Sequence, residues 1–122
     1  MAQSTLPDYA NRFFDAINRQ DSSAFLDAFT PDGIVDDWGR TYTGRDSIRS
    51  WSDKELIGAG GIFTPQRVKN RKNGVITVTG VYRSGHINGL NSFTLQQRDG
   101  KLTKVKIRKA WKTPSMWFAN NP

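Results

Sequence analysis

Two adjacent carboxylates, Asp36 and Asp37, lie in the stretch GIVDDWGRTYTGRDSIRSW at residues 33–51. The residues around them, IVDDW, are typical of a short apolar strand. Side chains of a strand alternate between its two faces, so one aspartate faces water and the other faces inward. An inward carboxylate can act as a general base, or it can be a structural acid bonded to the backbone or to a neighbour. Both interpretations depend on the elements that position the pair.

The size and composition of the chain limit the chemistry that this pair can take part in. The sequence has 122 residues and no second-domain linker, which predicts a single domain over residues 1–122. It contains no Cys and one His. Thiol chemistry is therefore excluded, and neither a protein-only zinc site nor a histidine-based triad is expected. We predict neither a metal nor a cofactor.

The apolar residues do not form a membrane segment. No stretch approaches the roughly 18 consecutive apolar residues of a membrane-spanning helix, so no membrane partner is expected. The N-terminal MAQSTLPDYANRFF lacks a basic region followed by an apolar run, and so it does not read as a signal peptide. We therefore predict a cytoplasmic location.

The chain is basic, with a net charge of +7, and its basic residues lie mostly in RVKNRKN (67–73) and KLTKVKIRK (101–109). Such runs can bind an acidic partner such as nucleic acid. In the second run, however, the charges alternate with Val105 and Ile107, which is typical of a strand with one buried face. Aromatic residues do not interleave with the charges as stacking platforms would. We favour a solvated outer face and do not expect a nucleic-acid partner; the alternative surface would use Lys69, Arg71, Lys72, Lys104, Lys106 and Arg108.

The first half of the sequence predicts three helices and one strand. Apolar residues recur at helical spacing in LPDYANRFFDAINRQD and in DSSAFLDAF, where Asp21 or Ser22 can cap the start. TPDG (30–33) is a turn signal that ends the second helix, IVDDW is the strand, and GRTYTG is expected to be a loop. RDSIRSWSDKELI (45–57) predicts the third helix, and GAGG (58–61) ends it.

The second half predicts strands. Pro65 makes the start of IFTPQRVKNRKN irregular, because proline cannot donate to a central ladder. NG at 73–74 and RDGK at 98–101 predict tight turns. Helices followed by a run of antiparallel strands predict an α+β domain, and a sheet that curls around the helices would enclose a cone-shaped pocket. The three segments most typical of strands are 75–84, 90–97 and 102–111.

This order of elements resembles the nuclear transport factor 2-like superfamily, whose members include SnoaL-like polyketide cyclases and ketosteroid isomerases. The resemblance is carried by RFFDAINRQDSSAFLDAFTPDGIVDDWG, TGRDSIRSW and FTLQQRDGKLTKVKI, and it covers about residues 5–110. It implies a curved antiparallel sheet wrapped around three N-terminal helices, a pocket and a homodimer. It implies no single activity, because this fold hosts many functions. The tail at 111–122 lies outside the resemblance, and its Trp111, Trp117 and Phe118 are expected to cover the sheet or a dimer interface.

The resemblance also implies which aspartate faces the pocket. In ketosteroid-isomerase-like members the catalytic base is an aspartate on the short strand before the third helix, and Asp37 lies at the matching position. Asp36 is then expected to face solvent, although a strand this short allows the two roles to be exchanged. An apolar pocket disfavours the charged form of a carboxylate, which suits Asp37 to removing a proton next to a carbonyl.

Two positions that match oxyanion donors of those isomerases carry different residues here. Phe13 stands where they have a tyrosine on the first helix, and Asn91 stands where they have a protonated aspartate. Phe13 cannot donate, whereas the Asn91 amide can. Losing one donor costs about 100- to 1000-fold in rate, so efficient steroid isomerisation is not expected. We expect Asn91 to face inward with Phe93 and to bond a ligand, Asp37 or a water.

Aromatic residues are the other candidates for the pocket wall. Trp38 and Trp51 would stack on a flat ligand, or pack in the core as Trp usually does. Tyr42 and Tyr82 offer hydroxyl donors, and His86 in the GHING turn is expected near the mouth of the cavity. The predicted ligand-binding residues are Phe13, Trp38, Trp51, Tyr82, His86 and Phe93.

Two functions fit these residues. The first is a cofactor-independent isomerase, cyclase or dehydratase that acts on a small apolar or aromatic carbonyl compound, with Asp37 as the base and Asn91 bonded to the oxygen. The second is a non-catalytic ligand-binding or protein-interaction domain of the same fold, which the missing tyrosine at position 13 favours. An Asp37→Asn variant separates them, because a binder keeps its affinity whereas an enzyme loses turnover.

Overall fold

The part of the chain that the computed structural model describes, residues 6–85 and 88–110, forms three helices and six strands. A short 3-10 turn, η1 (Lys72–Gly74), joins two of the strands. The helices are α1 (Asp8–Asn18), α2 (Ser22–Asp27) and α3 (Arg45–Glu55). The strands are β1 (Phe29–Asp37), β2 (Arg40–Thr43), β3 (Ile62–Asn70), β4 (Ile76–Arg83), β5 (Asn88–Arg98) and β6 (Lys101–Lys109).

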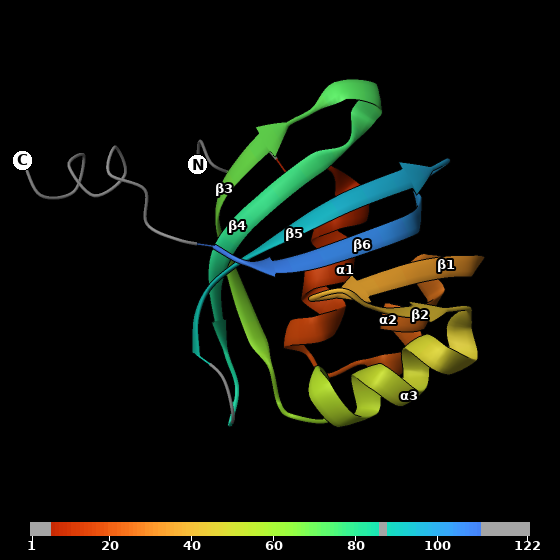
Figure 1. Ribbon diagram of the computed structural model, residues 1–122, viewed down its shortest axis with the longest axis vertical. Helices are drawn as coiled ribbons and strands as arrows, with labels where there is room; N and C mark the ends of the chain where they lie inside the picture. Colours follow the sequence, from red (N-terminus) through yellow and green to blue (C-terminus); the bar gives the residue numbers. More distant parts are fainter. Residues whose placement is uncertain (1–5, 86–87, 111–122) are drawn as a thin grey trace, which may run out of the picture.

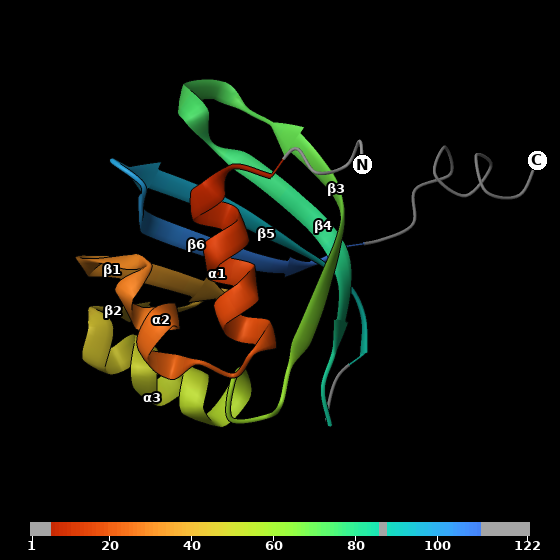
Figure 2. The same ribbon diagram turned by 180° about the vertical axis from the view of Figure 1, so that it is seen from behind.

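All six strands belong to one sheet in the order β2-β1-β6-β5-β4-β3. The sheet curls around α1, and the helices cover its concave face (Figures 1 and 2). This arrangement confirms the predicted α+β class and its cone-like shape. The sheet does not close, and β1 pairs in parallel with β6, so it is mixed rather than purely antiparallel. Parallel pairing is possible there because the connection from β1 to β6 is long and contains the helix α3 and four further strands.

Helix α1 crosses the sheet with its apolar face buried. That face consists of Ala10, Phe13, Phe14, Ala16 and Ile17, at the spacing expected of a helix with one side in a core. At its C-terminal end the Asn18 side chain bonds the backbone of Phe63 in both directions, at 2.7 and 2.8 Å. Helix α1 is thereby tied to the edge strand β3.

The structure differs from the predictions around residues 28–43. Phe29 and the following TPDG residues belong to β1 rather than to a helix and a turn, and a shift of register between Phe29 and Ile34 absorbs the irregular residues. GRTYTG is not a loop, because Arg40–Thr43 forms β2 and pairs with Ile34–Asp37. The first difference comes from long-range pairing of Phe29 with Leu102, and the second from a local hairpin that the loop-like composition of residues 39–44 did not indicate.

Other local signals agree with the structure. The Asp21 side chain caps α2 by accepting from Ala24 N at 3.0 Å. Pro65 lies on the edge strand β3, next to a shift of register. The predicted turns at 73–74 and 98–101 are present, with positive φ at Asn73 and Asp99.

Six phenylalanine rings fill the interior of the cone. Phe13 is 1% exposed and its ring centroid lies 5.1 to 6.2 Å from those of four other phenylalanines. Phe63 packs against Phe14 and Phe93 at 4.8 and 4.7 Å. The cluster consists of Phe13, Phe14, Phe25, Phe29, Phe63 and Phe93. It occupies space that would otherwise belong to a larger pocket.

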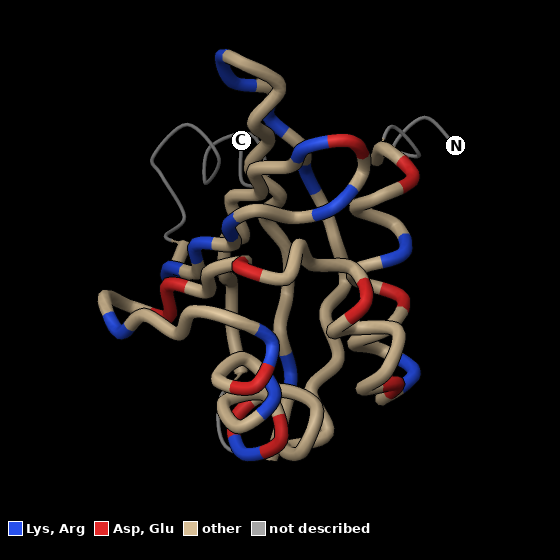
Figure 3. Tube along the Cα trace, turned by 90° about the vertical axis from the view of Figure 1, so that its right-hand side faces the viewer, with Lys and Arg blue, Asp and Glu red and all other residues tan. Residues whose placement is uncertain are grey.

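The basic strand β6 has the predicted alternation. Leu102, Val105 and Ile107 are buried, whereas Lys106 is exposed and Lys104 is partly exposed. Figure 3 shows Lys and Arg distributed along the molecule from the tip of the β3–β4 hairpin to the helices, rather than in one block. Within the described residues, no helix has the length and apolar character needed to cross a membrane.

Candidate functional site

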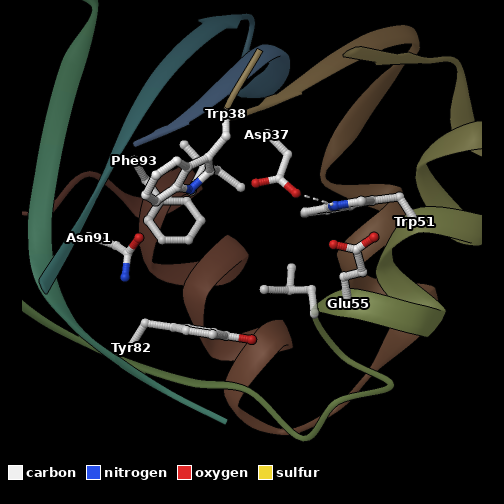
Figure 4. A pocket seen from close by; sticks show the side chains of 9 residues that line it. Asp37, Trp38, Trp51, Glu55, Tyr82, Asn91 and Phe93 are labelled. Atoms are coloured by element: carbon white, nitrogen blue, oxygen red, sulfur yellow. Dashed lines mark hydrogen bonds between the residues drawn. The ribbon is translucent and has the colours of Figure 1, made fainter. Parts of the chain in front are cut away.

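A pocket opens where the end of β1, the last turn of α3 and the strands β4, β5 and β6 come together (Figure 4). Its volume is about 80 Å³. The wall is mostly aromatic and aliphatic, with two carboxylates and one amide among the lining side chains. It consists of Asp37, Trp38, Trp51, Glu55, Leu56, Tyr82, Asn91, Phe93 and Ile107.

Asp37 reaches the pocket from the end of β1, because alternation along this strand puts it on the same face as the buried Val35. Its side chain is 13% exposed. The indole Nε1 of Trp51 donates to Asp37 Oδ2 at 2.9 Å, and an Arg40 Nη2 donates to the same oxygen at 3.3 Å. In Figure 4 the second carboxylate oxygen points away from Trp51, into the pocket. One oxygen of Asp37 is therefore held in place while the other faces the cavity.

Glu55 is a second carboxylate at the pocket that the sequence analysis missed. It lies in the last turn of α3, and its side chain is 42% exposed. Arg40, from the start of β2, bonds Glu55 Oε1 at 3.1 Å as well as Asp37. Residues 37, 40 and 55 lie on three different elements, so only the packing of α3 against the β1–β2 hairpin brings them together. The only sequence feature that could have indicated Glu55 was the acidic last turn of the predicted third helix.

Asp36 points to the opposite face of β1, as predicted, but it is covered rather than solvated. Its side chain is only 13% exposed because Arg108 binds both oxygens, at 3.0 and 3.2 Å. The backbone N–H of Gly39 donates to it at 2.8 Å. The Arg108 hydrogen bond holds the pKa of Asp36 below its ordinary value, in spite of the opposing effect of burial. Asp36 is thus a structural acid that joins β1 to β6 and closes the β1–β2 turn.

Trp38 stands at the mouth of the pocket in an unusual backbone conformation. Trp38 and Gly39 are the two residues of the β1–β2 turn and have φ of 56° and 93°, as a type I′ turn requires. A bulky residue with positive φ is uncommon. The Trp38 side chain is 55% exposed although it lines the pocket. The turn therefore holds a large aromatic ring partly in solvent beside the Asp37 carboxylate.

Tyr82 lies across the opposite side of the pocket, on β4 (Figure 4). Its hydroxyl oxygen is buried and makes no hydrogen bond of normal geometry with the described residues. Burial raises the pKa of Tyr82, an interaction with Ser84 opposes that rise, and the Asp37 charge adds to it. Gly61 packs so closely against this hydroxyl that any side chain there would overlap it. Burial thus favours the neutral form of this phenol.

Comparison with known protein families shows to which family the chain belongs. The SnoaL-like domain matches residues 10–105, which is most of the sequence. The chain belongs to the SnoaL-like domain family. The match runs from α1 into β6 and so includes the elements that form the pocket. A search of curated proteins found no match.

Solved structures share the fold of this SnoaL-like domain. A polyketide cyclase-like protein from Sinorhizobium meliloti is 24% identical, with a TM-score of 0.75, over 84% of this chain and 95% of that one. A Catenulispora acidiphila protein with a ketosteroid isomerase-like fold, solved in complex with trimethylamine, is 20% identical, with a TM-score of 0.72, over 88% and 89%. A computationally designed 17-OHP binder is 11% identical, with a TM-score of 0.75, over 86% and 90%. At these identities the likeness concerns the fold alone.

The pocket of this SnoaL-like domain brings together six of the eight residues predicted for the site. These are Asp37, Trp38, Trp51, Tyr82, Asn91 and Phe93. Phe13 was predicted to line the pocket, but it is buried in the phenylalanine cluster because α1 turns it toward Phe25 and Phe29. His86 lies outside the described residues, as do Trp111, Trp117 and Phe118 of the tail.

Asn91 faces inward with Phe93 and Leu95, as the alternation of β5 predicted. It is 8% exposed, and its Nδ2 donates to Gly89 O at 3.3 Å rather than to Asp37. An amide nitrogen carries two hydrogens, so one remains for another acceptor. Tyr42, the other tyrosine considered, stacks on Trp51 with ring centroids 5.9 Å apart. It supports the residue that holds Asp37. In the described part of the chain, no three metal-ligating side chains gather at one place.

Proposed function

We propose that this SnoaL-like domain binds a small, largely apolar carbonyl compound and that Asp37 removes a proton from the carbon next to the carbonyl. The observation that carries the proposal is the position of the Asp37 carboxylate. One oxygen is fixed by Trp51 at 2.9 Å, and the other is directed into a mostly apolar pocket. A general base needs a free lone pair, a fixed orientation and little competing water, and this arrangement supports all three.

The proposed step moves one proton and one electron pair. The proton passes from the substrate carbon to Asp37 Oδ1, and the C–H electrons form the enolate, whose charge lies on the carbonyl oxygen. Two groups of the pocket can donate to that oxygen, the second N–H of Asn91 and the Tyr82 hydroxyl. Return of the proton from Asp37 to another carbon gives an isomer. Attack of the enolate carbon on a second carbonyl, whose oxygen takes up that proton, gives a ring, and departure of a β-hydroxyl with that proton, as water, gives a dehydration.

The size of the pocket limits the substrate. An engineered apolar cavity of about 150 Å³ holds benzene. The pocket here is about 80 Å³. A steroid nucleus does not fit in this volume, because the phenylalanine cluster fills the rest of the cone. The substrate is therefore a small molecule, or a larger one of which only the reacting end enters while the remainder lies against the exposed Trp38.

Deuterium exchange tests the proposal without knowledge of the natural substrate. The protein is incubated in D₂O with small ketones, and loss of the proton signal next to the carbonyl is followed by NMR. We expect the wild type to accelerate exchange for at least one ketone and Asp37→Asn to abolish that acceleration. Asp53→Asn is the matched control, because Asp53 lies exposed on α3 outside the pocket. Equal exchange by wild type and Asp37→Asn would contradict the role of Asp37.

A second candidate function is ligand binding without turnover. Phe13 favours it, because the helix residue that would match a donor tyrosine has no hydroxyl and does not reach the pocket. The trimethylamine complex and the designed binder give it general support, because both are ligand-binding proteins of this fold. In this case a ketone binds, as judged by tryptophan fluorescence, but no exchange is accelerated.

The homodimer and the cytoplasmic location remain predictions from the resemblance and the sequence. Sedimentation equilibrium tests the first directly. A mass of about twice the 13.8 kDa of the chain is expected.

A further inference from the structure

The mouth of the pocket is locally acidic in a protein that is otherwise strongly basic. Asp37 and Glu55 both line it, and Arg40 contacts them from outside the lining, at 3.3 and 3.1 Å. Among these three described side chains one cation faces two anions, which leaves a net charge of −1 for the cluster. The chain as a whole carries +7. Distant charges are screened beyond about 10 Å in ordinary buffers, so the local balance decides what binds.

Aromatic rings form much of the remaining wall. Trp38, Trp51, Tyr82 and Phe93 come from four separate elements or turns and line the same cavity. The face of an aromatic ring attracts a cation through its quadrupole, and Trp does so most strongly. Rings combined with carboxylates favour an organic cation over a neutral ligand, because the carboxylates attract the charge while the rings contact its alkyl groups.

The Arg40 guanidinium does not itself fill the space between the aromatic rings. Its side chain is 61% exposed and it bonds Oδ2 of Asp37, the oxygen that also accepts from Trp51. The other Asp37 oxygen points into the cavity (Figure 4). Arg40 therefore fixes the two carboxylates from the solvent side and leaves the space between the rings open.

The Tyr82 hydroxyl adds a polar group to this wall. Tyr82 is 8% exposed, and its buried hydroxyl oxygen interacts with Ser84. The oxygen also has lone pairs that can face a positively charged head group. The volume of about 80 Å³ matches a head group of only a few heavy atoms.

We infer that this pocket binds a small organic cation, the alkylammonium head of an amine or a quaternary amine, between the aromatic rings and the carboxylates of Asp37 and Glu55. The inference goes beyond the proposed function, because it assigns to the same pocket a ligand class of its own, a cation rather than a neutral carbonyl compound. It does not require Asp37 to remove a proton.

A pair of ligands of equal shape tests the inference on the full chain. Choline and 3,3-dimethylbutan-1-ol differ in one atom, a charged nitrogen in the first and a neutral carbon in the second. Binding is followed by tryptophan fluorescence and calorimetry at constant ionic strength. We expect choline to bind at least about tenfold more tightly, because only the charged ligand gains from the net negative mouth. Equal affinity for the two, or no binding of choline, would overturn the inference.

Two matched variants test whether the negative charge of Glu55 contributes to choline binding. Glu55→Gln keeps the shape of the side chain and removes its charge, and we expect it to weaken choline binding about tenfold. Asp53→Asn removes a charge from the same helix outside the pocket and leaves the affinity unchanged. Circular dichroism checks that both variants are folded. Equal choline affinity in Glu55→Gln and wild type would also overturn the inference.

The two proposals fail separately. Choline binding and ketone exchange are measured on the same wild-type protein with different ligands. If choline does not bind but exchange depends on Asp37, the ligand class is wrong and the general base stands. If choline binds with the expected preference but no ketone exchanges, the site is a cation-binding pocket and the proposed chemistry is wrong.

Discussion

The indole nitrogen of Trp51 and the carboxylate of Asp37 are joined by a 2.9 Å hydrogen bond between α3 and β1. The bond fixes one oxygen of a carboxylate whose other oxygen faces the pocket. Trp51 is itself 5% exposed and stacked by Tyr42. The orientation of the candidate base is thus set by the packing of a helix against a hairpin.

Trp51→Phe tests this orientation. The ring remains to pack on Tyr42, but the donor is lost, so the Asp37 side chain can rotate. We expect ketone exchange to fall about ten- to a hundredfold, since a displaced catalytic group costs that much. The free energy of unfolding, measured by urea denaturation, should fall by about 1 kcal/mol. An unchanged exchange rate in a folded variant would show that the Trp51 bond does not position the base.

Trp38→Asn should separate stability from binding. Asn tolerates positive φ far better than Trp, and Asn-Gly is the preferred pair for this turn. Because Trp38 is already 55% exposed, little buried area is lost. We expect the free energy of unfolding to rise by about 1 kcal/mol while choline binding weakens severalfold. A loss of stability would mean that the ring contributes more to packing than its exposure indicates.

Phe13→Tyr tests the assignment of Phe13 to the core. A hydroxyl placed among the surrounding phenylalanine rings would be buried without a partner. We expect a loss of about 1–3 kcal/mol in the free energy of unfolding and no gain in ketone exchange. A neutral effect on stability with faster exchange is the opposite outcome, and it would place this position at the pocket after all.

Asp36→Asn should destabilise the protein in a pH-dependent way. Arg108 holds the pKa of Asp36 below the ordinary value of 3.8, so the folded state binds the proton more weakly than the unfolded chain. The stabilisation is therefore fully present above pH 3.8 and is lost as the pH falls through the folded-state pKa. At pH 7 we expect Asp36→Asn to cost about 1 kcal/mol, since Arg108 is partly exposed.

Urea denaturation of wild type and variant between pH 3 and 7 measures this difference. Asp32→Asn is the control, because Asp32 lies exposed on the same strand. The gap between wild type and Asp36→Asn should narrow toward acid pH. A gap that stays constant across the range would mean that the Arg108 contact is not responsible.

Tyr82→Phe probes the buried hydroxyl. Burial raises the pKa of Tyr82, so its phenol should stay protonated beyond the ordinary value of 10. The variant should lose part of the late-titrating tyrosine absorbance at alkaline pH. We expect its stability to lie within about 1 kcal/mol of wild type and its ketone exchange to fall about tenfold or more, because a donor to the enolate oxygen is removed. Unchanged exchange would exclude Tyr82 as that donor.

Local patterns determined much of the fold. The helical spacing in α1 and the alternation in β5 and β6 follow from one rule, that each element buries one face. The same rule required one of Asp36 and Asp37 to face inward, and it put Asn91 beside Phe93. These expectations depend only on neighbours along the chain, whereas the choice of Asp37 as the inward residue came from the family resemblance.

Contacts between distant segments decided the rest. No local signal distinguishes Phe13, which packs among other phenylalanines, from Phe93, which also reaches the pocket. No local sequence pattern predicts that β1 pairs with β6 or that Arg108 covers Asp36. The pocket is small because rings from helices and strands meet inside the cone.

The charge of the site is also a tertiary property. No sequence pattern links Asp37, Arg40 and Glu55. They form one cluster because α3 packs against the β1–β2 hairpin. The residues of the hairpin itself determined that a carboxylate would face inward. The pocket wall around that carboxylate depends on strands β4, β5 and β6 from the far end of the chain, because a side chain's environment is made by whatever the fold packs against it.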